Sequence, residues 1–559
     1  MKPGVGIVGR GEPRSSTAAQ PRGTPRRGWF RGEGAGEAHR GVATPRPVPA
    51  WLTTGPARSL RAGLVLGLTA LLALGAALRC FEYDETYLYM YLAGLPKPDW
   101  PLEPRTVAEL RGWIDGQRAG PLQVVQDLVR HQTHPPLHFW LMIPWLAPWG
   151  FDNLAARLFS VLCGAASMLV AWRLAAVARV PGLPAVACTF LAYAVFYPAT
   201  LARAYALALL LVLLGALALA LLLRDAEEGR RRDGAWLAAG AGLAFGLAGL
   251  SHYLALIAGA ALGGAFALTM LAQRRAWPVL AAALGGLPPF LLVLAVRADQ
   301  VTVDWFHPDF VLSRDAVRVV EMVAAALFAR TPVLLDAPWK GLATVLVAPC
   351  LLLVGGTVLF GIRHIMADPV RRVLLAGALA MPAGLFVLGA LTDRAPFVSR
   401  YASYSVPFLA ICFAAGLGRM GAWRPRLAAA VFGYVLLWQA VGAGSQVAWT
   451  ATQQEFRLIV SEVARRWVPG QSVLLVPAGY DGIGKNGPYL WEAPPDWPMA
   501  VVALPGDQSV EHLGSERNLF LVTFVELSGE WILDRLRPAL REQGWRLTET
   551  AEYLEVWSR

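Results

Sequence analysis

Apolar segments of roughly the length of a membrane span recur along most of the chain, separated by short polar junctions. A helix needs ~20 apolar residues to cross the hydrocarbon core of a bilayer, and most of these segments approach that length. The pattern predicts a polytopic α-helical membrane protein with about 11–13 transmembrane helices. The apolar segments are residues 60–78, 135–149, 154–177, 183–201, 204–223, 235–250, 253–272, 279–296, 342–362, 373–391, 402–417 and 427–441.

The two ends of the chain lack this pattern. Residues 1–55 are rich in Gly, Pro, Arg and Ser without apolar periodicity, so we expect a disordered basic tail. Residues 56–444 form the predicted transmembrane domain, and residues 79–134 are its long polar outer loop, expected to fold as short surface helices. Residues 445–559 have the composition of a soluble protein and predict a small α/β domain. Its expected elements are helices at 455–467 and 531–543 and strands at 471–477, 518–525 and 553–557.

Composition supports the membrane assignment. The 559 residues are 56% hydrophobic and 16% charged, with a mean hydropathy of +0.45, whereas a soluble domain is about 25% charged. A wholly soluble enzyme and a mostly disordered chain are both excluded. Of the net charge of +11, the first fifty residues contribute +6, from nine Lys/Arg and three Asp/Glu. This concentration fits a cytoplasmic tail before a first span, and we expect no nucleic-acid partner.

Arginine clusters set the expected orientation, because basic residues are retained on the cytoplasmic side. Arg58 and Arg61 flank the first span, which places the N-terminus in the cytoplasm. The later basic clusters alternate consistently with the spans, and an odd number of spans places the C-terminal domain outside the cytoplasm. We therefore expect a multi-pass protein of the plasma (inner) membrane. The later clusters include Arg173/Arg179, Arg230–Arg232, Arg274/Arg275, Arg363/Arg371/Arg372 and Arg419/Arg424/Arg426.

Ionisable residues gather at the outer ends of the apolar segments, and such residues at membrane depth indicate function by default. Asp84 and Glu85 follow the first span within the sequence Glu82-Tyr83-Asp84-Glu85. A carboxylate at this position can act as a general base. The alternative is a solvated helix start, where acidic residues are favoured by the helix dipole.

Histidines mark two further junctions. His134 precedes two prolines that open a helix, and His131 and His138 lie nearby. Three histidines could indicate a metal site, but the Pro-Pro break spoils the i, i+4 geometry, so a helix start with a polar contact is favoured. His252 and Tyr253 form the other junction and are assigned to the same outer pocket.

Arginine followed closely by tyrosine occurs twice at the outer face, as Arg203 with Tyr205 and as Arg400 with Tyr401. A guanidinium group offers paired donors to phosphate oxygens, so these pairs predict a phosphate site at headgroup depth. The alternative is that the arginines extend to the interface without binding a ligand. In residues 305–308, Trp-Phe-His-Pro, an interfacial anchor is slightly favoured over stacking on a sugar.

The order of these motifs resembles a known family. Asp84-Glu85, His134-Pro135-Pro136-Leu137, Arg203-Ala204-Tyr205-Ala206-Leu207, His252-Tyr253 and Arg400-Tyr401 are similar to the bacterial protein O-mannosyltransferase and aminoarabinose transferase group. These are membrane glycosyltransferases of the C-type fold that use polyprenyl-phosphate sugars. The resemblance covers roughly residues 60–441.

The resemblance implies a role for several residues. Asp84 corresponds to the base that deprotonates the acceptor hydroxyl, and Glu85 to a neighbour that orients acceptor or donor. Arg203, Tyr205 and Arg400 fall where the family holds the lipid phosphate. Gly150-Phe151-Asp152-Asn153 followed by Arg157 matches a family turn, for which a structural role is favoured.

A sugar linked to phosphate already has a good leaving group, so transfer needs a base for the hydroxyl and cations for the phosphate. The resemblance, together with this chemistry, implies transfer from a polyprenyl-phosphate sugar to a hydroxyl of a protein, lipid or glycan acceptor at the outer face, with inversion. A lipid or solute transporter or flippase is the alternative, although transporters place polar sites near the midplane in paired repeats, which are not visible here. A scaffold that presents the C-terminal domain is a third hypothesis. No cofactor is indicated with certainty, and a divalent metal ion is left open.

Overall fold

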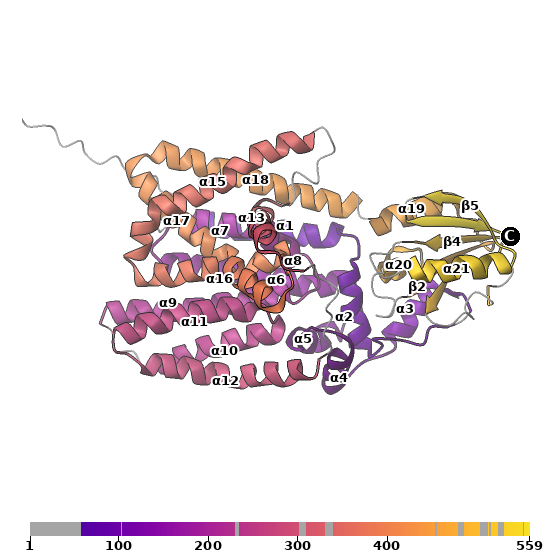
Figure 1. Cartoon of the computed structure of the whole chain (residues 1–559), viewed down its shortest axis with the longest axis horizontal. Helices are drawn as coiled ribbons and strands as arrows, with labels where there is room; N and C mark the ends of the chain where they lie inside the picture. The colour runs from indigo at the N-terminus through magenta and orange to yellow at the C-terminus, as the bar shows by residue number, and fades with distance from the viewer. Residues whose placement is uncertain are drawn as a thin grey trace, which may run out of the picture. The chain divides into compact units, whose positions relative to one another are not determined.

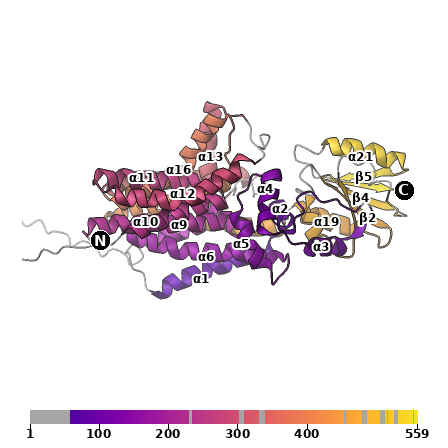
Figure 2. The same cartoon turned by 90° about the horizontal axis from the view of Figure 1, so that it is seen from below.

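The computed structural model describes residues 58–559 apart from residues 102, 230–233, 301–308, 330–338, 453–454, 479–485, 504–511, 514–515, 524–529 and 552. The predicted tail (residues 1–55), the basic residues 230–232 and the aromatic segment 305–308 therefore lie outside the described residues. Long helices predominate in the described part of residues 58–452, and the strands belong to one sheet that includes the C-terminal region (Figures 1 and 2).

Nine helices in the described part of the chain are long and apolar enough to cross a membrane. A bent pair, α7 (Gly182–Phe190) and α8 (Tyr193–Ala199), breaks by 62° and raises the number to ten if it is one span. The shorter apolar helices α5 (Leu137–Leu146) and α10 (Ala235–Ser251) account for the remaining segments. The protein is thus a multi-pass membrane protein, as predicted. The nine are α1 (Arg58–Leu78), α6 (Asn153–Val177), α9 (Tyr205–Glu227), α11 (Ala255–Ala272), α12 (Trp277–Ala298), α15 (Trp339–Met366), α16 (Pro369–Thr392), α17 (Val406–Trp423) and α18 (Pro425–Thr452).

Small residues let neighbouring helices approach closely. Helices α9 to α12 lie side by side (Figures 1 and 2). A Cβ atom added to Gly242 of α10 would lie 1.9 Å from the carbonyl oxygen of Ala282 in α12, and one added to Gly285 would lie 2.1 Å from that of Ala239. Glycine permits such backbone contact between membrane helices, where packing replaces the hydrophobic effect as the source of association.

Gly242→Val is therefore expected to separate α10 from α12 and to lower the melting temperature of the detergent-purified protein by several degrees, because overpacking typically costs about 1–3 kcal/mol. Gly240→Val is the matched control, since nothing lies within 4 Å of a Cβ atom at Gly240. Equal melting temperatures for the two variants would contradict the close approach of the helices.

The outer loop folds as α2 (Tyr83–Ala93), α3 (Val107–Asp115) and α4 (Pro121–His131), and it adds a short strand, β1 (Arg105–Thr106). This strand pairs antiparallel with β3 (Pro498–Ala503). The short helices were predicted and the strand was not, because two residues carry no alternating pattern. The outer loop and the C-terminal region therefore share one sheet, with strand order β1-β3-β2-β4-β6-β5.

The sheet has a helix on each face. Strand β2 (Ser472–Ala478) is parallel to β3 and to β4 (Asn518–Val522), while β6 (Leu554–Ser558) is antiparallel to β4 and to β5 (Arg546–Ala551). Successive side chains of a strand point to opposite faces. Val473 and Leu475 thus share a core with leucines of α21 (Glu530–Glu542), whereas Leu474 and Val476 share one with α19 (Glu455–Arg466). A short helix, α20 (Pro488–Glu492), lies between β2 and β3 in the sequence.

The architecture expected from the sequence is confirmed: a polytopic helical protein with a small α/β region at its C-terminal end. The expected C-terminal helices and strands all occur, within a few residues of their predicted ends. Strands β3 and β5 were not predicted, and the residues of β5 are mostly exposed and polar. The domain boundary at residue 445 stays a prediction; α18 continues to Thr452.

Candidate active site

Asp84 lies in the first turn of α2, immediately after the first span. The backbone N–H of Glu82 donates to a Glu85 carboxylate oxygen at 3.1 Å, which fixes the start of the helix. Acidic residues in a first turn are stabilised by the helix dipole. Asp84 and Glu85 are nevertheless buried, with 5% and 1% of their surface exposed. Burial excludes the solvated helix start that the sequence left open, because a buried carboxylate requires partners.

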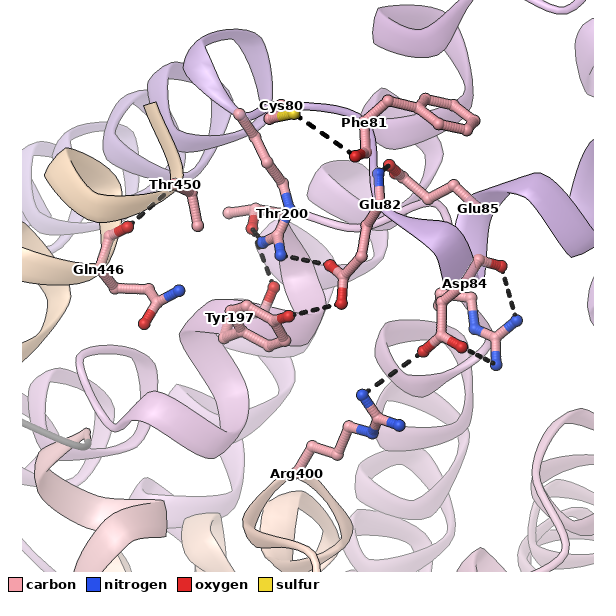
Figure 3. A network of polar contacts seen from close by, with 12 residues as sticks. Cys80, Phe81, Glu82, Asp84, Glu85, Tyr197, Thr200, Arg400, Gln446 and Thr450 are labelled. Atoms are coloured by element: carbon pink, nitrogen blue, oxygen red, sulfur yellow. Dashed lines mark hydrogen bonds and ion pairs between the residues drawn. The ribbon is translucent and has the colours of Figure 1, made fainter. Parts of the chain in front are cut away.

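Arg203 and Arg400 supply those partners from distant parts of the chain. Arg203 precedes α9, and Arg400 lies in a 3₁₀ helix, η3 (Ser399–Tyr404), that precedes α17. One Arg203 nitrogen is 3.5 Å from Oδ1 of Asp84, and one Arg400 nitrogen is 3.4 Å from Oδ2. Arg203 also donates to the Asp84 carbonyl at 2.9 Å. Figure 3 shows the Arg400 guanidinium pointing at the Asp84 carboxylate.

The electrostatics of this cluster keep Asp84 ionised. Burial alone would raise the pKa of its carboxyl, but Arg203 and Arg400 outweigh burial and hold the pKa below its usual value. Oδ2 of Asp84 has no hydrogen-bond partner among the described residues, although Arg400 lies within ion-pair distance. The carboxylate therefore retains an oxygen that can accept a proton from a substrate.

His134 joins the cluster through Arg203. Its Nε2 lies 3.0 Å from an Arg203 nitrogen. Burial and the nearby Arg203 charge lower the pKa of the His134 imidazole well below its usual value. Arginine only donates hydrogen bonds, so the neutral His134 ring accepts one here. Gln300 donates to the His134 carbonyl at 3.0 Å and accepts from the Tyr253 hydroxyl at 2.9 Å.

Aromatic rings line the cluster beside Arg400. The Tyr205 ring lies 4.7 Å from the His252 ring and 6.4 Å from the Tyr401 ring, measured between centroids. The Arg400 guanidinium lies 5.9 Å from the Tyr205 ring centroid, a cation–π distance. The structure thus brings all the predicted pocket residues into one connected group, with Tyr253 connected through Gln300.

Glu85 has a different environment from its neighbour. Arg157 of α6 donates hydrogen bonds to both carboxylate oxygens of Glu85, with nitrogen–oxygen distances of 2.8 and 2.6 Å. The backbone N–H of Ala202 donates to the same group at 3.0 Å. Arg157 also donates to three backbone carbonyls between Ala76 and Cys80. Paired in this way, Glu85 and Arg157 connect α2 and α6 to the segment that carries Arg203.

A second buried network lies beside Asp84 and was not assigned from the sequence (Figure 3). Arg79 forms an ion pair with Glu82 and donates to the Thr200 hydroxyl at 3.1 Å. The Tyr197 hydroxyl donates to Glu82 at 2.7 Å. Tyr197 and Thr200 lie at the end of the bent α7–α8 pair. They belong to the polar stretch Tyr197–Tyr205 between two apolar segments, and this stretch is the feature of the sequence from which the network could have been predicted.

The described residues contain no group of three or more His, Cys, Asp or Glu side chains able to hold a metal ion. A small hollow of about 10 Å³ lies beside Arg203 and is lined by His134, Tyr205 and His252 among others. Such a space holds about one water molecule. Side chains at this position must therefore move before a larger ligand can enter.

Comparison with known proteins bears directly on this site. Residues 133–295 match the family described as dolichyl-phosphate-mannose-protein mannosyltransferase. The resemblance to C-type membrane glycosyltransferases is confirmed. The matched segment carries His134, Arg203, Tyr205, His252 and Tyr253 and supports glycosyl transfer as the class of reaction. No curated protein sequence matches the chain.

One solved structure has a similar overall fold, and two others are less similar by TM-score. ArnT from Cupriavidus metallidurans in the apo state has 13% identity and a TM-score of 0.51, over 90% of this chain and 98% of that one. The structure of the same ArnT bound to undecaprenyl phosphate has 14% identity, a TM-score of 0.47 and the same coverage. A mutant of the arabinofuranosyltransferase AftD from Mycobacteria has 13% identity and a TM-score of 0.35, over 91% of this chain and 42% of that one.

Proposed function

We propose that the protein transfers a sugar from a polyprenyl-phosphate donor to an acceptor hydroxyl at the outer face of the plasma membrane. The observation that carries the proposal is the gathering of Arg203 and Arg400 around the buried carboxylate of Asp84. The family match over residues 133–295, with its dolichyl-phosphate-linked sugar, supports the donor class.

The three residues match the needs of the reaction. Asp84 takes the proton of the acceptor hydroxyl as its oxygen attacks C1 of the sugar. The bond between C1 and the phosphate oxygen breaks, and the polyprenyl phosphate leaves with one more negative charge. Arg203 and Arg400 stabilise that charge through paired donors. Attack from the face opposite the phosphate inverts the anomeric centre.

Donor binding is also expected to change the pKa of the Asp84 carboxyl. In the unliganded site both guanidinium groups face Asp84, which lowers the pKa of its carboxyl and makes it a weak base. A donor phosphate that accepts hydrogen bonds from Arg203 and Arg400 shares their charge and raises the pKa of Asp84. The base therefore strengthens only when the donor is in place. We assign Tyr205 and Tyr401 to the phosphate side of the pocket and His134, His252 and Tyr253 to its walls.

Glu85 is assigned a positioning role. Its oxygens are held by Arg157 and the Ala202 N–H. Through these bonds Glu85 fixes Asp84, its neighbour on α2, against the segment that bears Arg203. The Arg79–Glu82–Tyr197 network supports the other side of the same turn.

A transporter fits the site less well. Asp84 lies at the start of α2, Arg203 just before α9 and Arg400 just before α17. Charges at helix ends fit chemistry at the membrane boundary, whereas transporters hold substrate near the midplane. The acceptor class, protein, lipid or glycan, is left to experiment, as is the predicted placement of residues 445–559 outside the cytoplasm.

The test is incubation of the purified protein with a panel of polyprenyl-phosphate sugars and a mixture of candidate acceptors, followed by mass spectrometry of released polyprenyl phosphate. Release from at least one donor, dependent on acceptor, is expected. Intact donors throughout, together with transport of a donor across vesicles, would favour the flippase alternative.

The lowered pKa of Asp84 predicts the pH dependence. A base is active when deprotonated, and the free enzyme keeps Asp84 ionised below its usual pKa. The kcat/KM value, which reports free-enzyme groups, is therefore expected to stay level as the pH falls from about 8 to about 5. The donor phosphodiester does not titrate in that range. An acid limb centred near neutral pH would contradict this electrostatic account.

A further inference from the structure

A second hollow lies among the basic clusters that the proposed reaction does not use. It has a volume of about 700 Å³, within the range of ligand-binding pockets. Arg179 after α6, His364 in the last turn of α15 and Arg419 in the last turns of α17 line it. Phe360 and Trp423 supply aromatic surface.

This hollow is separate from the Asp84 site. Helix α17 begins at Val406, directly after the 3₁₀ helix that carries Arg400, and ends at Trp423. At 1.5 Å per residue its 18 residues span about 27 Å. Arg419 and Trp423 therefore lie at the other end of the helix from the proposed donor site, on the side predicted to be cytoplasmic.

The lining is cationic. It contains two arginines and a histidine and no carboxylate. Arg419 forms no ion pair within the described ranges, and Arg179 pairs only with the partly exposed Glu228 at 3.3 Å, a contact of little strength. Arg371, a buried cation that pairs with Asp368 at 3.1 Å, also lies close enough to His364 to act on it electrostatically, as does Asp368 with the opposite sign. The Nε and Nη1 groups of Arg371 have no hydrogen-bond partner among the described residues.

Helix α15, which contributes Phe360 to the lining, carries exposed apolar surface that suits acyl chains. Phe360 of α15 is 43% exposed, and Leu352 and Leu359 of the same helix are 76% and 68% exposed. In a membrane-spanning helix such residues face lipid. Trp423 is 65% exposed at the helix end, where tryptophan typically lies at headgroup depth. The apolar surface of α15 matches the acyl chains of a phospholipid, and the guanidinium groups of the hollow match its phosphate headgroup.

We propose that this hollow binds an anionic phospholipid, with its headgroup phosphate between Arg179 and Arg419 and its chains along α15. Basic side chains at the membrane surface attract anionic headgroups, and pockets between spans concentrate that attraction. The bound lipid joins α15 and α17, so it stabilises the end of the bundle opposite the active site. The proposal does not depend on the proposed transferase activity.

The test is native mass spectrometry of the full chain with phosphatidylglycerol and with phosphatidylcholine of the same acyl chains. Retention of phosphatidylglycerol is expected to exceed that of phosphatidylcholine. The double variant Arg179→Gln/Arg419→Gln is expected to weaken phosphatidylglycerol binding by about tenfold. The control Arg274→Gln/Arg275→Gln removes the same charge on the same predicted side but outside the hollow, and is expected to bind as the wild type does.

Three outcomes would overturn the proposal. Equal retention of the two lipids would remove the preference for negative charge. An equal loss of phosphatidylglycerol binding in both double variants would mean that the lipid is attracted to the basic face in general and not to this hollow. Displacement of the lipid by millimolar inorganic phosphate would indicate a site for free phosphate. Arg179 and Arg419 are exposed, and unchanged melting temperatures check that the variants remain folded.

Discussion

Asp84→Asn is expected to abolish sugar transfer, lowering kcat by at least about 10²-fold, because general base assistance contributes 10²–10⁴-fold. Asparagine has the shape of aspartate but cannot take the acceptor proton. It also leaves the Arg203 and Arg400 guanidinium groups without the carboxylate they face at 3.5 and 3.4 Å. The measurement is the rate of polyprenyl phosphate release under saturating donor, followed by mass spectrometry.

Two comparisons separate loss of the base from loss of the fold. Asp99→Asn changes an exposed aspartate of the same outer loop and is expected to keep full activity. Asp84→Glu keeps the charge but displaces it, and is expected to recover part of the rate. If Asp84→Asn retained wild-type turnover, Asp84 would not be the base, whatever the fate of the arginines.

Arg400→Ala is expected to have the second largest effect, a loss of about 10²–10³-fold in kcat/KM for the lipid-linked donor. Arg400 approaches Asp84 from η3, and its side chain is 21% exposed, so a phosphate can reach it. Removing it takes away one of two cations that stabilise the leaving phosphate. Steady-state kinetics with varied donor and fixed acceptor measure the effect.

Arg394→Ala is the matched control for Arg400→Ala. Arg394 lies in the same junction before η3 but forms an exposed ion pair with Asp309 at 2.8 Å. Exposed pairs contribute little, so donor kinetics should be unchanged. Equal effects of the two substitutions would assign Arg400 a general role in the junction and remove it from phosphate binding.

The sequence was sufficient to predict apolar helices able to cross a membrane, and it singled out the charged residues that the structure brings together, because both depend on simple physical patterns. Apolar runs must be helical in a bilayer, where every backbone group needs a partner. Charges at membrane depth are costly, so Asp84, Arg203 and Arg400 were conspicuous against their apolar surroundings. The sequence predicted that they share one face, and the structure shows that they lie in one cluster.

Other features depend on contacts that no local pattern encodes. Glu85 and Asp84 are neighbours with similar chemistry. Their partners distinguish them: Arg157 and the Ala202 N–H hold the Glu85 carboxylate, whereas Oδ2 of Asp84 has no hydrogen-bond partner among the described residues. The pairing of β1 with β3 joins segments almost four hundred residues apart through two residues at register Arg105↔Met499 and Thr106↔Pro498. Such pairings require the fold to be known first.

The central claim is that Asp84 and the two arginines form one donor-phosphate site, and titration of the purified protein with a polyprenyl phosphate tests it most directly. The matched ligand is the neutral polyprenol of the same length, and intrinsic tryptophan fluorescence reports binding. Asp84→Asn is expected to bind the phosphate at least as tightly as the wild type, because a competing negative charge is gone, and Arg400→Ala about tenfold more weakly or worse. Equal affinity for the phosphate and the alcohol, or unchanged phosphate affinity in Arg400→Ala, would contradict the account.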